Sequence, residues 1–426
     1  MYQYCVASFS KKAVRAVGSQ HSSCEKKTGG NLAPRDAKRI LEELEDYNKN
    51  YADVYKRQEQ REWAEFYLKG QLSDLERKTV EPMVLAMKGR DMAAVRAVQQ
   101  FLGEGAWEDA ALLNRRERMV AEDIGEDEGV LICGKGDFLK KGGHSVGVAP
   151  QYCGDLGKIA NCQQGVFLVY TSSHGYTFID RRLYMPEIWF SEKYAGMRER
   201  CGVPTELKFK FESELADEMI REVVKRNQLP FQWVNAGENL GINADFLDSI
   251  DALRKWYVVE VPNNLTVWPV DVKIASPRTG SKGGGRLKVQ EVQQIGATLP
   301  TTAWERYEDN KKPITAEFAF VRATSKRGLR LGHSVWVVFR RGLNPDVESK
   351  CYLSNAPANC SRQTLARLSE LYWPVQAALE ESKSELGMDQ YETRTWRGWH
   401  HQMTMGFLAH HFLLRLRLKS ESKPPR

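Results

Sequence analysis

The sequence predicts an α/β protein in which a layer of strands and helices follows a helical N-terminal region. Three observations predict this class. From Asp36 to about residue 123, apolar residues recur at three- and four-residue spacing, which is typical of amphipathic helices. Between residues 130 and 251, short apolar runs alternate with an amphipathic segment, and helical spacing returns from Ser361 almost to the end. The 426 residues, 42% of them hydrophobic, are enough to build several layers around a core.

The N-terminal third divides into an extension and a helical domain. Residues 1–35 carry six lysines and arginines against a single acid, Glu25, with serine and glycine between them. This composition predicts a flexible basic extension. Residues 36–123 hold the segments DAKRILEELEDYNKNY and EQREWAEFYLKGQLSDLERKTVEPMVLAM, and they predict a helical N-terminal domain.

Residues 124–255 predict the first part of the α/β layer. The runs VLIC, Ser145–Val148, GVFLVYTSS and GYTFIDRRLY are expected as strands, ELADEMIREVVKRNQ as a helix and FQWVNAG as a buried strand. This order predicts a three-stranded antiparallel start followed by a helix and another strand.

The remaining residues predict an insertion, a helical segment and a tail. Residues 256–345 carry strand-like runs around the loop SPRTGSKGGGR, which predicts a β-rich insertion. Residues 346–415 are expected to form the C-terminal helices of the core, and residues 416–426 a basic tail.

Charge and composition exclude some classes of protein. No apolar run approaches the roughly 18 residues of a membrane helix, so we expect no membrane partner and a cytoplasmic protein. The formal net charge of +7 gives weak support to a polyanionic partner. The eight cysteines form no Cys-x-x-Cys pair, and we expect them to be reduced. The pairs His400/His401 and His410/His411 are expected to be structural or on the surface, because neighbouring helix residues diverge.

The stretch GVLICGKG, from Gly129 to Gly136, is almost a phosphate-binding P-loop. Such a loop needs flexible glycine-rich backbone, a following helix and a closing Ser or Thr. Here the four intervening residues are apolar, position 136 is glycine, and KKGGHSVGV continues as a hairpin. We therefore interpret the stretch as a core strand and reject a nucleotide site.

Four longer stretches resemble the bacterial insertion-sequence transposases of the DDE class over about residues 40–420. They are GDFLKKGGHSVGVAPQYCGDLGKIANCQQGVFLVYTS, PFQWVNAGENLG, CYLSNAPA and WPVQAALEESKSELGMDQYETRTWRGWHHQM. The resemblance implies a ribonuclease-H-like mixed sheet flanked by helices, with a helical DNA-binding N-terminal domain and an inserted β-rich subdomain. It also implies a bacterial, nucleoid-associated protein, terminal inverted repeats as the DNA partner, and a homodimer.

The resemblance implies two-metal phosphoryl transfer, in which three acidic side chains hold two Mg²⁺ ions. At the three matching positions this chain has Gly134, Gly237 and Gln376 instead of two aspartates and a glutamate. We therefore expect no bound cofactor and no intact catalytic residue, although Mg²⁺ serves the family. Among neighbouring acids, Glu380 is the best spare, because it lies one helical turn beyond Gln376. Asp137 is expected to point to the opposite face of its strand, and Glu238 to do so if its strand continues that far.

DNA contact does not need the carboxylates, because lysine, arginine and backbone amides bind phosphates. The candidates for this contact are Lys140, Lys141, Lys383, Arg394, Arg397 and the loop from Arg278 to Arg286. Trp396 and Trp399 could stack on a base, but we expect at least one of them in the core.

These observations leave three hypotheses open. The first is a transposase-family protein that binds the DNA ends of an insertion sequence and does not cleave them. The alternative is an active DDE transposase that cleaves and transfers strands with displaced acids such as Glu380. The third is a remnant without a selected role.

Overall fold

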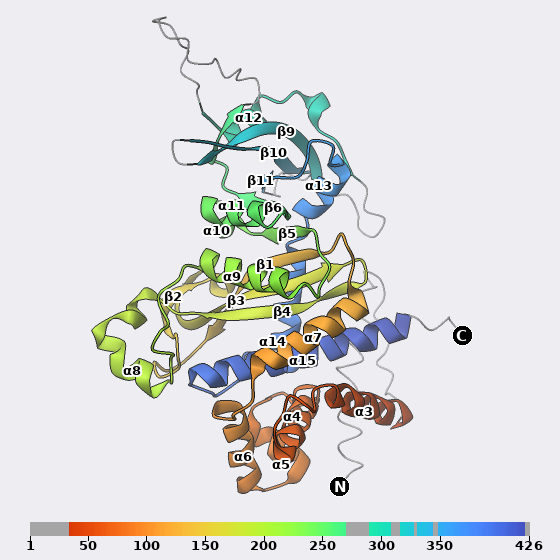
Figure 1. Ribbon diagram of the computed structural model, residues 1–426, viewed down its shortest axis with the longest axis vertical. Helices are drawn as coiled ribbons and strands as arrows, with labels where there is room; N and C mark the ends of the chain where they lie inside the picture. Colours follow the sequence, from red (N-terminus) through yellow and green to blue (C-terminus); the bar gives the residue numbers. More distant parts are fainter. Residues whose placement is uncertain (1–33, 270–288, 308–315, 328–329, 344–347, 422–426) are drawn as a thin grey trace, which may run out of the picture.

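The computed structural model describes residues 34–269, 289–307, 316–327, 330–343 and 348–421. Its helices and strands form three regions along the long axis of the molecule (Figure 1). A group of helices occupies one end, a sheet flanked by helices occupies the middle, and further strands occupy the other end. Residues 1–33 of the predicted basic extension and the candidate loop Arg278–Arg286 lie outside the described residues.

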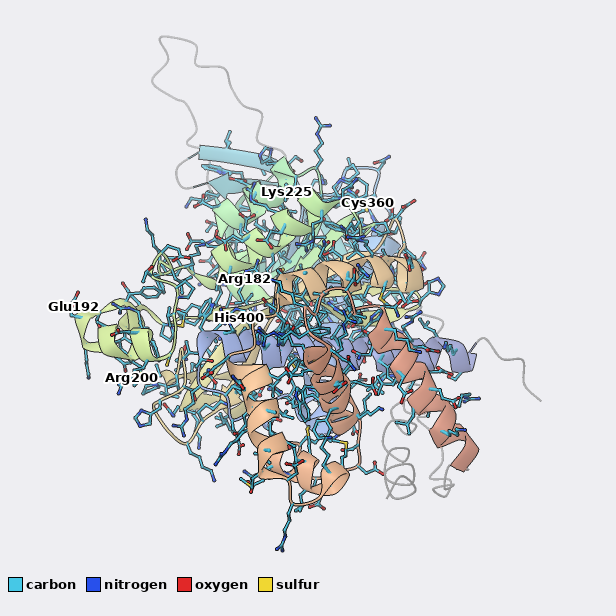
Figure 2. The ribbon with its side chains drawn as sticks, turned by 60° about the horizontal axis from the view of Figure 1, so that its bottom comes forward. Arg182, Glu192, Arg200, Lys225, Cys360 and His400 are labelled. Atoms are coloured by element: carbon cyan, nitrogen blue, oxygen red, sulfur yellow. The ribbon has the colours of Figure 1, made fainter. Side chains whose placement is uncertain are left out.

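Among the described residues, five helices form the N-terminal region, as predicted from the helical spacing: α3 (Pro34–Lys49), α4 (Gln58–Gln71), α5 (Val80–Lys88), α6 (Met92–Gly103) and α7 (Asp109–Ile124). Figure 2 brings this end of the molecule forward. Its core also includes buried residues of the C-terminal helix α15 (Trp396–Glu421), among them Met405, Leu408 and Phe412. The last helix of the chain thus joins the N-terminal helices to the rest of the protein.

The central sheet begins with three antiparallel strands and continues with two parallel ones. Strand β1 (Val130–Leu139) pairs antiparallel with β3 (Lys158–Ser172), which pairs antiparallel with β4 (Gly175–Tyr184). On the other side of β1, β5 (Trp233–Ala236) and then β6 (Trp256–Val261) run parallel to it. The order β4-β3-β1-β5-β6 with flanking helices confirms the predicted ribonuclease-H-like fold. Because Gly129–Gly136 leads into and forms β1, the rejection of a P-loop is confirmed as well.

The strand predicted at Ser145–Val148 is wrong. Val146 and Val148 are buried, which explains the apolar alternation, but Gly147 has a positive φ of 70° that interrupts extended backbone. The amide of Val146 bonds the carbonyl of Arg394, and that of Val148 closes a turn on Ser145. The strand at this place is instead β2 (Ala149–Cys153), which pairs antiparallel with β3.

The predicted insertion at 256–345 begins too early. Its first run, Trp256–Val261, is β6, the second parallel strand of the core. The later strands extend the same sheet in the order β6-β11-β10-β9-β7-β8. These strands are β7 (Thr266–Pro269), β8 (Gln290–Glu291), β9 (Ala316–Arg327), β10 (Arg330–Gly342) and β11 (Lys350–Ser354). The inserted strands therefore continue the core sheet through backbone hydrogen bonds.

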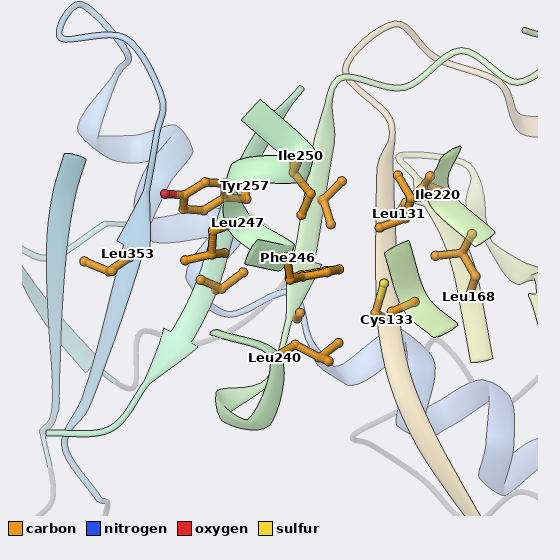
Figure 3. Close-up of a cluster of buried hydrophobic side chains, with 14 of the residues drawn as sticks. Leu131, Cys133, Leu168, Ile220, Leu240, Phe246, Leu247, Ile250, Tyr257 and Leu353 are labelled. Atoms are coloured by element: carbon orange, nitrogen blue, oxygen red, sulfur yellow. The ribbon is translucent and has the colours of Figure 1, made fainter. Parts of the chain in front are cut away.

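Helices cover both faces of the sheet. On one face, α9 (Glu212–Arg226) and α11 (Ala244–Ala252) pack on alternate strand residues such as Leu131 and Leu168. Figure 3 shows that this apolar layer runs from β1 and β3 to Tyr257 of β6 and Leu353 of β11. On the other face lie α13 (Arg362–Ser369), α14 (Trp373–Leu386) and α15. The shorter helices are α8 (Ala195–Arg200), α10 (Glu238–Gly241) and α12 (Val292–Ala297), with 3₁₀ turns at Gly154–Leu156, Glu187–Phe190, Glu192–Tyr194 and Thr301–Ala303.

The predicted basic tail at 416–426 is helical as far as Glu421. Arg417 in this segment is buried and pairs with Glu381 at 3.1 Å, so these residues belong to the packed end of α15. His401, His410 and His411 on the same helix are also buried, in agreement with a structural role. Within the described ranges, no helix has the length and apolarity needed to span a membrane.

Candidate functional site

The three predicted metal-binding positions line one cavity of about 270 Å³. Cys133 of β1 pairs with Ala236 of β5, so Gly134 and Gly237 are the next residues at the same level of the sheet. Gln376 comes from α14, which lies on the face of the sheet that α13 and α15 also cover. The structure thus brings Gly134, Gly237 and Gln376 together beside the carboxyl ends of the parallel strands β5 and β6.

The backbone at Gly134 is packed directly against α14. A Cβ atom at this position would lie 2.6 Å from Cγ2 and 2.9 Å from Cγ1 of Val375. Carbon atoms in contact normally lie about 3.5–4.0 Å apart, so an aspartate fits here only if Val375 moves. At Gly237, by contrast, a Cβ would lie 3.5 Å from the ring of Tyr372, which is ordinary contact. The two glycines therefore differ in whether the surrounding structure has space for an acidic side chain.

Three glutamates line the same cavity, and two of them pair with lysines. Glu212, at the start of α9, lies 3.4 Å from the Nζ of Lys135. Glu260 lies 2.9 Å from the Nζ of Lys350. Glu238 lines the cavity and forms no ion pair with another described residue. The carboxylates of Glu212 and Glu260 are therefore each balanced by a lysine of the protein.

The three positions that match the family's metal ligands do not fit a pair of Mg²⁺ ions. Magnesium requires near-octahedral oxygen ligands, usually carboxylates with water and substrate phosphates. Gly134 and Gly237 have no side-chain oxygen, and Gln376 contributes only a neutral amide. Across the part of the chain that the structure describes, no three His, Cys, Asp or Glu side chains are arranged to hold a metal.

The neighbouring acids considered as replacements have different positions. Asp137 is buried beside β3, where it accepts bonds from the Gly154 amide (2.6 Å) and from Gln164 (2.8 Å), and it does not line the cavity. Glu380 is exposed on α14 and is not a lining residue either. Glu238 lines the cavity: β5 ends at Ala236 and α10 starts at Glu238, so the strand does not continue to this residue and the condition under which it would point away is not met.

Sequence reasoning missed Glu212, Glu260 and Lys350 as cavity residues. Glu260 follows Val259, which pairs with Ala236, so it stands at the level of Gly237 on the next strand. Its place would have followed from the strand register of β5 and β6. Glu212 and Lys350 approach from α9 and β11, and no local spacing indicates this approach.

A second group of predicted residues lines a basic groove, which we define as two adjoining cavities of about 580 and 470 Å³. Lys140, Lys141 and Arg394 line the larger cavity, together with Arg77 and His144. The smaller cavity adds Arg96 of α6. Both cavities share Thr79, Tyr391, Glu392 and Arg394, so the groove runs between the N-terminal helices and the segment before α15.

Lys140 and Lys141 differ in how they are held. The Nζ of Lys140 lies 3.4 Å from the ring centroid of Tyr391 and donates to the carbonyl of the same residue at 3.3 Å. Burial lowers the pKa of Lys140 to about 8, because the charged ammonium is partly removed from water. Lys141 and Arg394 are exposed. Lys140 lies six residues beyond Gly134, about 20 Å along an extended strand, so the groove and the cavity are separate places.

The other predicted DNA-binding residues do not line the groove. Lys383 pairs with Asp155 at 2.6 Å and lies 5.4 Å from the ring centroid of Phe138. Arg397 is exposed and donates to the carbonyl of Glu104 at 3.3 Å. Trp399 is fully buried, in agreement with the expectation that at least one of the two tryptophans belongs to the core.

Comparison with known proteins agrees with the geometry of the sheet. The family model described as DDE superfamily endonuclease matches residues 50–318, more than half of the chain. The match includes Gly134 and Gly237 and ends before Gln376. No curated protein matches the chain. A DDE-class transposase fold is thus shown by the family match and by the ribonuclease-H-like strand order, and the chain belongs to the DDE superfamily endonuclease family.

Proposed function

We propose that this chain is a DNA-binding protein of the DDE transposase class that no longer cleaves DNA strands. Family members are nucleases that typically use Mg²⁺. The observation that carries the proposal is the cavity in which Gly134, Gly237 and Gln376 meet without a carboxylate among them. We infer that the loss affects the whole metal site, because none of the three positions holds a carboxylate.

The packing around Gly134 supports this proposal independently of the residue types. Val375 fills the space that an aspartate side chain would need. Lys135 and Lys350 neutralise two of the three cavity glutamates, which otherwise would be the nearest anionic ligands for a metal. A two-metal site tolerates little displacement of its ligands, since attacking and leaving oxygens must both be held in line.

The alternative function is an active transposase with displaced acids. Glu380 gives this alternative little support, because it does not line the cavity. Three other carboxylates do favour it: Glu212, Glu238 and Glu260 all line the cavity. An active enzyme would have to release the first and third of these from their lysine partners and draw all three around the metal.

The basic groove supports the DNA-binding half of the proposal. Lys140, Lys141 and Arg394 come from two separate parts of the sequence and line one continuous depression. Lysine and arginine side chains so arranged bind phosphates regardless of base sequence and make the affinity dependent on salt. We propose the groove as the path of a DNA strand or duplex, with the element's terminal inverted repeats as the expected target.

Cleavage is tested with the purified full chain on supercoiled plasmid and on labelled duplexes carrying the flanking terminal repeats, in Mg²⁺ and in Mn²⁺. We expect no nicking above a protein-free control. Metal-dependent nicking would overturn the proposal if it disappeared in both Glu238→Gln and Glu260→Gln, because a contaminating nuclease would be insensitive to these changes. Activity lost only in Glu380→Gln would instead establish the spare acid that the sequence suggested.

Binding is tested by fluorescence anisotropy with a labelled duplex at 50–200 mM salt. Removing one phosphate contact lowers the salt slope by about one, so Lys141→Gln and Arg394→Gln are each expected to weaken binding and flatten the slope. The matched control is Lys225→Gln on α9, which removes the same charge from an exposed lysine outside the groove (Figure 2). Equal losses in all three variants would indicate attraction to net charge alone, as expected of a remnant.

The homodimer remains a proposal from the family. Light scattering after size-exclusion chromatography, with and without DNA, measures the mass directly against the 48.6 kDa chain. We expect the dimer mass at least in the DNA complex, because the family resemblance implies a homodimer.

A further inference from the structure

Helices α5 and α6 form a helix-turn-helix whose second helix presents an unpartnered polar face. Helix α5 ends at Lys88 and α6 begins at Met92, so only three residues join them. Gly89 has a φ of 79°, which a residue with a side chain rarely adopts, and Asp91 caps α6 by accepting the Ala94 amide at 2.9 Å. A short turn containing glycine between two packed helices is typical of DNA-binding helix pairs.

One face of helix α6 is packed into the protein core. The buried face of α6 consists of Ala94, Val95, Val98, Phe101 and Leu102, and it packs with residues of α4 and α5 in one apolar core. The spacing of these residues places them along a single stripe of the helix. The remaining face is therefore presented at a fixed position.

The exposed face of α6 has the composition of a base-reading surface. Met92, Arg96, Gln99 and Gln100 are exposed, and Met92 keeps 59% of its accessible surface. Helix α6 contains no acidic residue from Met92 to Gly103. Among the described residues, the side chains of Arg96, Gln99 and Gln100 form no hydrogen bond or ion pair. These side chains are therefore free to contact a ligand without first breaking a bond within the protein.

We propose that α6 enters the major groove of DNA and that Arg96, Gln99 and Gln100 contact base edges. This inference rests on the proposed DNA binding and names the side chains that would give it sequence preference. Arginine pairs best with guanine, and glutamine with adenine, through two parallel hydrogen bonds each. Met92 can contact a thymine methyl group from the first turn, the part of a recognition helix that normally lies deepest in the groove.

The surroundings of α6 fit a duplex better than a protein partner. Lys88 and Arg90 flank the turn and are exposed, as expected for contacts to the phosphates on either side of a groove. Arg96, Gln99 and Gln100 also line the smaller cavity of the basic groove, so the face is continuous with Arg394. An α-helix with its side chains is about 10–12 Å in diameter, which fits the roughly 12 Å wide major groove.

The test is selection of duplexes from a randomised pool by the full chain, followed by affinity measurements on the selected sequence and its single-base variants. We expect a preferred sequence containing at least one G·C pair, at which Arg96→Ala lowers the discrimination roughly ten- to a hundredfold. Gln99→Ala and Gln100→Ala are expected to relax preference at an A·T pair. Each variant replaces an exposed residue by the best helix former, so folding should persist, and circular dichroism verifies it.

The matched control is Arg118→Ala on α7, an exposed arginine outside the basic groove. It should leave base preference unchanged. The inference is wrong if the chain prefers a sequence and the three α6 variants keep the same preference. It is also wrong if the chain binds DNA without any base preference. In both cases the proposed DNA binding itself is retained. If the chain does not bind DNA, the proposed function itself fails.

Discussion

Replacing Gly134 by alanine tests the packing of the cavity that Gly134, Gly237 and Gln376 line, without adding a charge. The new Cβ would lie 2.6 Å from Cγ2 of Val375, about 1 Å closer than carbon atoms in contact. Gly237→Ala is the matched control, because its Cβ would lie 3.5 Å from the Tyr372 ring. Neither glycine has a positive φ, so the backbone accepts alanine at both places.

The expected free energies follow from two contributions. Overpacking a core costs about 1–3 kcal/mol. A Gly→Ala change that the backbone accepts stabilises by about 0.4–1 kcal/mol through the unfolded chain. Gly134→Ala is therefore expected to lower the free energy of unfolding by about 0.5–2 kcal/mol, and Gly237→Ala to leave it unchanged or slightly raised. In a Val375→Ala background, where the obstructing methyl groups are gone, Gly134→Ala should cost nothing, which gives a coupling of about 1–3 kcal/mol.

Urea unfolding followed by tryptophan fluorescence and circular dichroism measures these differences on the full chain. The four proteins of the cycle are wild type, Gly134→Ala, Val375→Ala and the double variant. An equal cost of Gly134→Ala in both backgrounds, or a cost no larger than that of Gly237→Ala, would refute the steric account of this position. It would also remove one of the two structural supports for loss of cleavage.

Three further outcomes are expected. Burial lowers the pKa of His401 and of His411 to about 4, below the roughly 6.5 of the unfolded chain. Acidification from pH 6.5 towards 4 should therefore lower the free energy of unfolding by about 1.4 kcal/mol per pH unit for each histidine. Urea unfolding at pH 5 and 7 should show a smaller difference in the free energy of unfolding for His411→Gln than for wild type. Since the pKa of Lys140 is lowered to about 8, wild-type stability should gain a contribution from this group as pH rises from 8 towards 10.5, and thermal melts of Lys140→Met should lack it. Gly387→Ala, at a φ of 64° and with its Cβ 2.7 Å from that of Lys78, should destabilise by about 1–3 kcal/mol in the urea assay.

Much of the core could be predicted from the sequence because its patterns are local. The amphipathic repeat of α9 and the apolar runs of β1, β3, β4 and β5 each report the burial of neighbouring residues along one element. The positions of Gly134, Gly237 and Gln376 in one cavity followed from the family resemblance, which carries long-range information that spacing lacks.

The errors concern features that depend on pairing between distant segments. The apolar run of β6 fits an insertion as well as a core strand, and only its parallel pairing with β5 distinguishes them. The segment with Val146 and Val148 alternates like a strand, yet its backbone bonds go to Arg394 and to a turn. The lysine partners of Glu212 and Glu260 were missed for the same reason, since charge pairing across elements leaves no periodic signal.

The continuity of the sheet has a consequence for synthesis of the protein. Strand β6 ends at Val261, and the strand that completes its free edge, β11, starts at Lys350, about 90 residues later. At ribosomal rates of about 5–20 residues per second, the nascent chain presents an unpaired strand edge for roughly 5–20 s. An exposed edge is a template for pairing with another chain, so this interval is when association between nascent chains and capture by chaperones should be greatest. The family match ends within β9, and a chain shortened there would keep that edge unpaired permanently.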